Sequence, residues 1–182
     1  MGYTHYWYRP EELDGNIFPS FVVDARKLAE EWDRSQGNGH LAGPTGEEGT
    51  DPEFSRTIVS FNGLEDDSHE SFIIQQMFPR DGYRSVDEGG RLFDFCKTAR
   101  KPYDALVCAV LIAFKHHFGD AVVVSSDGEW EPKDNPIQEW TGKDWVETGE
   151  YEREDGWELG SLLYHRVFPD RDSTTSILRE DM

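Results

Sequence analysis

The sequence predicts an α+β fold with the ferredoxin-like, split βαβ arrangement. Three observations predict it: the segments follow the order β-α-β-β-α-β, the first strand carries rings on both faces, and the second helix is apolar nearly all round. We expect residues 1–128 to form one domain, a four-stranded antiparallel sheet with both helices on one face. Residues 129–182 would form a Trp-rich, acidic extension packed on that domain.

The chain opens with a strand and a helix. Residues 2–9 are rich in aromatic and β-favouring side chains and end before Pro10. Because successive side chains alternate, rings lie on both faces, and this strand is expected in the middle of its sheet. Residues 19–34 place apolar side chains at helical spacing, with charged side chains on the opposite stripe.

Two strands, a helix and a last strand complete the predicted domain. The segments 56–62 and 71–78 are predicted to pair as an antiparallel hairpin. Residues 102–118 form the clearest helix, which begins with Pro102 and should be the most buried one. A β-branched strand over 121–126 follows it.

The extension differs from residues 1–128 in its composition and in its hydrophobic pattern. Four tryptophans lie among acidic residues, and most of the segment lacks a helical or strand-like period. Residues 158–168 are predicted to form either a short helix or an edge strand. The tail from Pro169 is expected to be ordered only in part.

The chain is strongly acidic. Its 182 residues include 37 Asp and Glu against 18 Lys and Arg, which gives a formal net charge of −19. This balance excludes nucleic-acid binding through a broad basic surface. The acids are spread along the chain and 12 arginines outnumber 6 lysines, which indicates a halophilic, saline cytoplasm. A DNA mimic that occupies a nucleic-acid-binding partner is the alternative.

Location and redox state follow from what the sequence lacks. It has no apolar run of about 18 residues and no secretory signal, so a cytoplasmic protein without a membrane partner is expected. Cys96 and Cys108 lie among apolar side chains. They are expected to be free, buried thiols.

The first candidate site is the segment 96–104, Cys-Lys-Thr-Ala-Arg-Lys-Pro-Tyr-Asp, at the start of the buried helix. It gathers three cations in an acidic chain, and unpaired N–H groups at a helix N-terminus favour an anion. The alternative is a set of local ion pairs with the surplus acids. The candidate ligand-binding residues here are Lys97, Thr98, Arg100, Lys101 and Tyr103.

The second candidate site is the opening strand. Ligands of split βαβ sheets often lie on the open face, stacked on aromatic side chains. We expect His5 there as a general acid or base, with Tyr3 as its helper, in one pocket with the cations. The alternative is a core strand with one satisfied histidine. The further candidate binding residues are Tyr6, Arg9 and Asn62.

No metal or cofactor is predicted. The adjacent His116 and His117 point about 100° apart on a helix, so they do not easily share an ion, and no Cys/His set has a recognised spacing. Ser125 and Ser126 lack the Gly-x-Ser-x-Gly pattern of a nucleophile elbow. A phosphate-binding loop and a dinucleotide fingerprint are also absent from the sequence.

Four sequence blocks carry a resemblance. They are residues 2–7 (Gly-Tyr-Thr-His-Tyr-Trp), 61–63 (Phe-Asn-Gly), 95–104 (Phe-Cys-Lys-Thr-Ala-Arg-Lys-Pro-Tyr-Asp) and 126–128 (Ser-Asp-Gly). The chain thereby resembles an uncharacterised family of small proteins carried by phages, prophages and some cellular genomes. The resemblance covers the chain up to about the first tryptophan of the extension. It implies a mobile-element origin and the same two sites, and it supplies no chemistry.

These observations predict an accessory protein of a virus or mobile element in a halophilic host. It would bind a phosphate-bearing ligand, such as a nucleotide or nucleic-acid end, or inhibit a component of host defence. One alternative is an enzyme acting on phosphodiester bonds, with His5 as acid or base and Lys97 and Arg100 as charge stabilisers. Two roles without catalysis stay open beside it. They are an acidic DNA mimic, and a virion or assembly protein that presents the Trp-rich extension to a protein partner.

Overall fold

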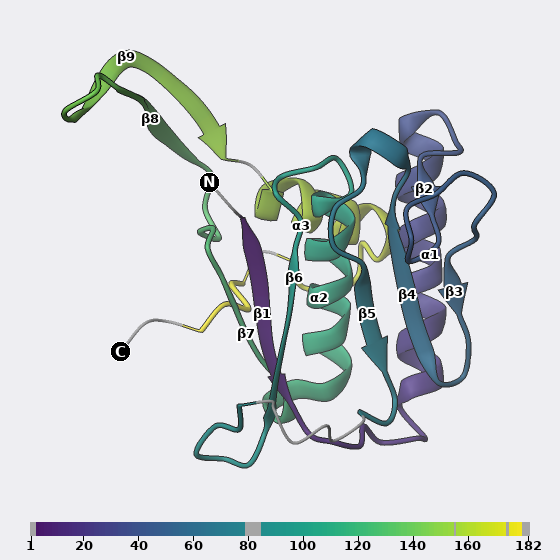
Figure 1. Ribbon diagram of the computed structural model, residues 1–182. Helices are drawn as coiled ribbons and strands as arrows, with labels where there is room; N and C mark the ends of the chain where they lie inside the picture. Colours follow the sequence, from purple (N-terminus) through teal and green to yellow (C-terminus); the bar gives the residue numbers. More distant parts are fainter. Residues whose placement is uncertain (1–2, 79–84, 155, 174, 180–182) are drawn as a thin grey trace.

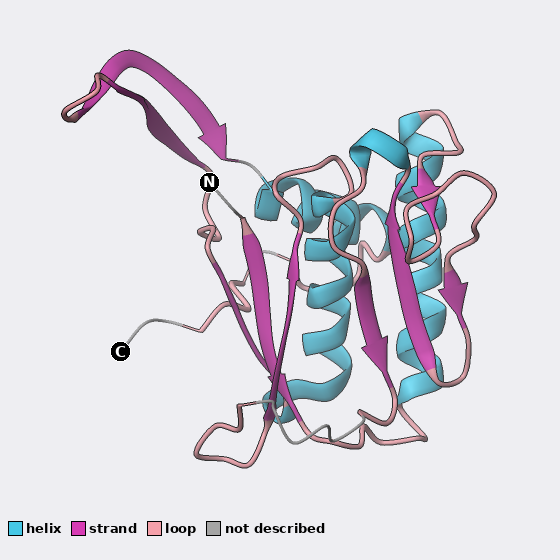
Figure 2. Cartoon of the chain, in the orientation of Figure 1, coloured by secondary structure: helices cyan, strands magenta, loops and turns pink. Residues whose placement is uncertain are grey.

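The computed structural model describes residues 3–78, 85–154, 156–173 and 175–179. Helices and antiparallel strands make up this part of the chain, so the fold is α+β, as predicted (Figures 1 and 2). Gly2, which the sequence assigns to the first strand, lies outside the described residues. None of the helices in these ranges has the length and apolar character needed to cross a membrane.

The first sheet has three antiparallel strands. β1 (Thr4–Arg9) lies between β6 (Leu92–Lys97) and β7 (Val123–Ser126), so the prediction of a central first strand is confirmed. One face of β1 is turned toward the helices and almost completely buried, because the core packs against it. The side chains on that face are Tyr3, His5, Trp7 and Arg9.

The second sheet is built around β4 (Ile58–Gly63). It pairs antiparallel with β5 (Phe72–Gln75), which confirms the predicted hairpin, and with the two-residue strands β2 (Leu41–Ala42) and β3 (Glu53–Phe54). A short 3-10 turn, η1 (Glu65–Asp67), follows β4. The backbone N–H of Glu70 donates to Lys97 O at 3.2 Å, which joins the two sheets.

The ferredoxin-like arrangement is not found. The place beside β1 is taken by β6, a strand that the sequence analysis did not predict, and the β4–β5 hairpin belongs to the second sheet. The strand was missed because β6 carries apolar side chains on both faces, with Leu92 and Cys96 buried and Phe95 exposed. A polar and apolar alternation, the usual sign of a half-buried strand, is therefore missing there.

The helices lie together on one side of the strands (Figure 1). α1 (Phe18–Gln36) and α3 (Gly156–Val167) both pack against α2 (Asp104–Phe118). Enclosed in this way, α2 is buried except at Ala105, Lys115, His116 and His117. The prediction of a second helix buried nearly all round is confirmed. The first two helices lie on the same side of the strands, but these strands form two sheets and not the single four-stranded sheet that was predicted.

The Trp-rich extension divides into two parts. β8 (Lys133–Trp140) and β9 (Trp145–Glu154) form a hairpin that projects from the body in Figure 1, with Trp140 and Trp145 exposed. The segment 158–168 is mostly helical and belongs to α3, so the helix, the first of the two predicted alternatives, is found.

Two smaller features complete the fold. A second 3-10 turn, η2 (Gly119–Ala121), lies between α2 and β7. Both cysteines are free and buried, as predicted.

Candidate functional site

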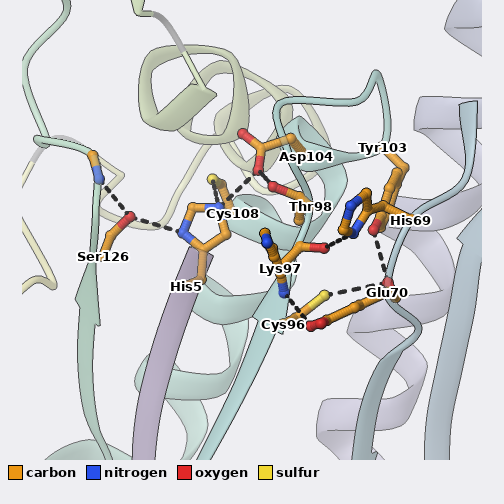
Figure 3. A network of polar contacts seen from close by, with 11 residues as sticks. His5, His69, Glu70, Cys96, Lys97, Thr98, Tyr103, Asp104, Cys108 and Ser126 are labelled. Carbon is orange, nitrogen blue, oxygen red and sulfur yellow. Dashed lines mark hydrogen bonds and ion pairs between the residues drawn. The ribbon is translucent and has the colours of Figure 1, made fainter. Parts of the chain in front are cut away.

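A polar network lies at one end of the first sheet (Figure 3). Because β1 runs antiparallel to β6 and β7, the start of β1 and the ends of its two neighbours meet there. α2 begins a few residues after β6 ends, so its N-terminus reaches the same place. The topology thereby brings together His5 from β1, Ser126 from β7 and Asp104 from α2, three residues far apart in the chain.

His5 is the centre of this network. Its Nε2 atom lies 2.8 Å from Asp104 Oδ1, and its Nδ1 atom lies 3.0 Å from Ser126 Oγ. The side chain is fully buried. Two rings hold the imidazole edge-on, Tyr3 at 5.3 Å and Trp157 at 5.2 Å between centroids. The imidazole is therefore fixed in one orientation by two hydrogen bonds and two aromatic contacts.

The direction of each hydrogen bond follows from the carboxylate, which only accepts. Asp104 accepts from the Thr98 hydroxyl and from His5 Nε2–H. A neutral imidazole with its proton on Nε2 is an acceptor at Nδ1, so the Ser126 hydroxyl donates to it. Ser126 Oγ in turn accepts the backbone N–H of Gly128 at 3.0 Å. The order Ser–His–Asp is that of a nucleophile, its base and the group that orients the base.

Asp104 occupies a favourable place for a buried negative charge. It stands in the first turn of α2, where the helix dipole favours an anion, and is 5% exposed. Two donors, the Thr98 hydroxyl and His5, satisfy one of its oxygens. The sequence predicts that an anionic ligand binds at the N-terminus of α2. In the structure the carboxylate of Asp104 occupies this position.

A second group of contacts surrounds Glu70. The Tyr103 hydroxyl donates to Glu70 O at 2.7 Å, and the Lys97 backbone N–H donates to Glu70 Oε2 at 2.8 Å. His69 Nδ1 lies 2.8 Å from Lys97 O. Burial raises the pKa of both the Tyr103 phenol and the Cys96 thiol. Both groups stay protonated at neutral pH, so Cys96 is a poor nucleophile.

The loop between β6 and α2 bends back over Tyr3. Ala99 and Arg100 both have left-handed backbone angles, with φ of 51° and 57°, a conformation that costs energy for residues with a Cβ. The Ala99 N–H donates to Tyr3 O at 3.1 Å, and the Arg100 guanidinium lies 4.7 Å from the centre of the Tyr3 ring. The Lys101 ammonium instead donates to a backbone carbonyl of η1.

Two predicted binding residues lie on β1 away from the network. Tyr6 is on the face opposite the helices, where its ring stacks on Phe93 and its hydroxyl donates to Asp127 at 2.9 Å. Arg9 is fully buried at the far end of the strand, and its guanidinium donates to backbone carbonyls. These positions place neither residue in one pocket with His5.

The surroundings of His5 and of Asn62 both differ from those that the sequence predicts. His5 faces α2 and not the open face of the sheet, so the expectation of a ligand-facing His5 on that face is wrong. Asn62 is buried, and its amide donates to His69 O at 3.0 Å and accepts from the His69 N–H at 3.1 Å. Asn62 therefore holds the connection between β4 and β5.

Sequence reasoning found part of this site. It selected Tyr3, His5 and Thr98, which the fold brings together, and it missed Ser126 and Asp104 as partners of His5. Both missed residues lie in segments that the sequence analysis names, Asp104 at the end of residues 95–104 and Ser126 at the start of residues 126–128. Nothing in those segments indicates the contacts that their side chains make with His5.

One set of side chains in this network has the composition of a metal site. Within the described ranges, His5, Asp104 and Cys108 have ligand atoms that all lie within 4.8 Å of one another. Imidazole, carboxylate and thiolate are the ligands that zinc takes in proteins. The set offers three of four positions, and a metal would have to replace the proton between His5 Nε2 and Asp104. The geometry therefore fits a proton there better than an ion.

Comparisons of the chain with protein-family models, with curated proteins and with solved structures find no match. The chemistry of the site is therefore inferred from its geometry.

Proposed function

We propose that this protein is an enzyme that cleaves a phosphate ester, with Ser126 as nucleophile, His5 as general base and Asp104 as the residue that orients the base. The observation that carries the proposal is the hydrogen-bond chain from Ser126 through His5 to Asp104, at 3.0 Å and 2.8 Å. Three separate chain segments supply these groups, and with a neutral imidazole protonated at Nε2 each hydrogen bond has the direction that nucleophilic catalysis needs.

The chemical steps follow from this chain. Ser126 Oγ attacks phosphorus while its proton passes to His5 Nδ1, and Asp104 stabilises the imidazolium that forms. His5 then gives the proton to the leaving oxygen as its bond to phosphorus breaks. Water, deprotonated by His5, attacks phosphorus in the phosphoryl-serine, its bond to Ser126 Oγ breaks, and Oγ recovers the proton; a phosphomonoester leaves when the substrate is a diester, and phosphate leaves when it is a monoester.

Neighbouring side chains support a phosphate over a carboxylic ester. Arg100 stacks on Tyr3, which packs against His5, so a guanidinium lies near the site for the charge of a phosphoryl group. The indole N–H of Trp157 is buried and has no hydrogen-bond partner among the described residues.

A second candidate function is ligand binding without chemistry. The complete burial of the His5 side chain favours it, because a base enclosed in the core is remote from solvent. The network would then hold the loop from Lys97 to Tyr103 in shape for a phosphate-bearing ligand. In that case the protein would act as the accessory or inhibitory factor that its composition and family resemblance suggest.

The test uses two serines on one strand. Ser126 faces His5, whereas Ser125 pairs with Tyr6 and faces the other way, which makes Ser125→Ala a matched control. We expect a fluorophosphonate to label Ser126, and the protein to hydrolyse bis(p-nitrophenyl) phosphate. Ser126→Ala should abolish both, Ser125→Ala neither, and Asp104→Asn should lower the rate by about 10²- to 10⁴-fold.

Three results would contradict the proposal. A folded protein that is neither labelled nor active would favour ligand binding without chemistry. Hydrolysis of p-nitrophenyl acetate without any phosphate ester would remove the phosphate part. Equal losses in the Ser125→Ala and Ser126→Ala variants would show that the serine facing His5 has no special role.

A further inference from the structure

A pocket of about 640 Å³ lies between β7, the second half of α2 and the C-terminal residues 175–179. The C-terminal segment is held against β7, because the Arg179 N–H donates to Val124 O at 2.8 Å and Leu178 pairs with Val124 as a parallel bridge. The pocket shares no residue with the Ser126–His5–Asp104 site. Its apolar wall includes Ile112, Val124, Ile177 and Leu178.

Basic side chains gather in this pocket. Arg91, Lys115, His116 and Arg179 line it together with one carboxylate, that of Asp172. This is a concentration of basic groups in a chain whose net charge is −19. The sequence analysis did not predict it, because the four basic residues come from separate segments of the chain.

Two of the cations are held in place before any ligand arrives. Arg91 Nε donates to Asp87 Oδ2 at 2.8 Å. The Lys115 ammonium donates to the carbonyls of Gly119 and Val122 at 3.0 and 2.9 Å, and it lies 3.5 Å from Asp120 Oδ1. Anchored donors lose less conformational entropy on binding than flexible ones, so such a site is preorganised.

We infer that this pocket binds a small phosphate-bearing ligand with a ring, of about the size of a mononucleotide. The apolar wall would take the ring, and the cations Arg91, Lys115 and Arg179 would take the phosphate. A volume of about 640 Å³ falls in the range of small-molecule sites. Thr175 and Ser176 line the same pocket, where the Thr175 hydroxyl donates to Asp172 and the Ser176 hydroxyl accepts the Leu178 N–H.

Calorimetry with matched probes tests this inference. Adenosine monophosphate, adenosine and inorganic phosphate are titrated at constant ionic strength into the full chain carrying Ser126→Ala, so that hydrolysis does not enter the signal. We expect adenosine monophosphate to bind at least about tenfold more tightly than either fragment. Arg179→Gln should weaken it by about tenfold, the usual effect of losing one charge-assisted contact.

Two further variants complete the design. Lys115→Met should also weaken binding, whereas Lys143→Met, in the turn between β8 and β9, should leave it unchanged. Lys115 also caps the end of α2, so its variant can lose stability. Arg179 is exposed, so Arg179→Gln tests the pocket in a folded chain.

The inference is overturned if adenosine monophosphate does not bind. Equal affinities for the nucleotide and for adenosine would also overturn it, as would binding that survives Arg179→Gln unchanged. The measurement is the heat of binding to a chain that lacks the Ser126 hydroxyl. Its result therefore does not depend on whether the protein hydrolyses phosphate esters.

Discussion

Replacing Gly160 by alanine is expected to destabilise the protein, although alanine is the better helix former. Gly160 is buried in α3 where this helix packs on α2. An added Cβ would overlap the Cβ of Cys108 and would lie 3.0 Å from Ala109 N and 3.1 Å from Ala105 O. Backbone atoms cannot turn away as a side chain can, so α3 would have to move off α2.

Two effects of opposite sign determine how much Gly160→Ala changes the free energy of unfolding. Alanine gains about 1 kcal/mol over glycine inside a helix. Overpacking a core costs about 1–3 kcal/mol, and the upper end applies here because two of the three close atoms belong to the backbone. We expect a net loss of about 1–2 kcal/mol in the free energy of unfolding. In a chain of this length that lowers Tm by about 2–8 °C.

Urea unfolding followed by far-UV circular dichroism, at constant KCl, measures this loss. Gly15→Ala is the control, because the nearest atom to its added Cβ is Gln76 Nε2 at 3.8 Å. The control should stay within about 0.5 kcal/mol of the parent chain. A Gly160→Ala chain as stable as the parent would refute the close contact between α2 and α3.

Three further predictions concern charge. Arg9→Met should lower the free energy of unfolding by about 3–5 kcal/mol in urea titrations, because it removes several hydrogen bonds that the buried guanidinium donates to backbone carbonyls, those of Pro10, Gln75 and Gln76 among them; a loss below about 1 kcal/mol would contradict this. Molar KCl should raise Tm, since it screens repulsion in a chain of net charge −19, and a flat or falling Tm would speak against it. Burial and Arg171 lower the pKa of His116, so its NMR titration should lie below the ordinary value of about 6.5. Its folded pKa is below its unfolded one, so its contribution to stability is present above the unfolded pKa and is lost as pH falls from that value through the folded pKa; a titration midpoint at or above the ordinary value would refute the lowered pKa.

The sequence predicted the elements that carry a period or a long apolar run and missed those with neither. α1 buries one stripe and β5 one face, which leaves a period in the sequence, whereas α2 was predicted from its apolar run after Pro102. β6 carries rings on the face turned away from the helices, with Phe93 and Phe95 in one row. β8 and β9 expose side chains on both faces. Neither case gives an apolar period, and the missing β6 led to the wrong sheet order.

The sequence predicts which segments of the chain contribute to the candidate site, but not which side chains contact each other there. The start of β1 and the start of α2 were both selected, but a contact such as Ser126–His5 depends on the register of β1 against β7. A shift by one residue would turn Ser125 toward His5 in place of Ser126, because side chains alternate along a strand. Sequence patterns do not set that register, so the partner of His5 could not be known.

Stability alone does not account for the network around Asp104. Buried polar groups of this kind often contribute no more than apolar side chains of the same shape would. The surroundings are otherwise apolar, since Trp7, Cys108 and Val124 are buried in the same core. The Asp104 carboxylate only accepts, so the hydrogen bond between them places a proton on His5 Nε2. In the neutral imidazole with that proton, Nδ1 accepts the Ser126 hydroxyl, and this is the direction that the proposed nucleophilic attack requires.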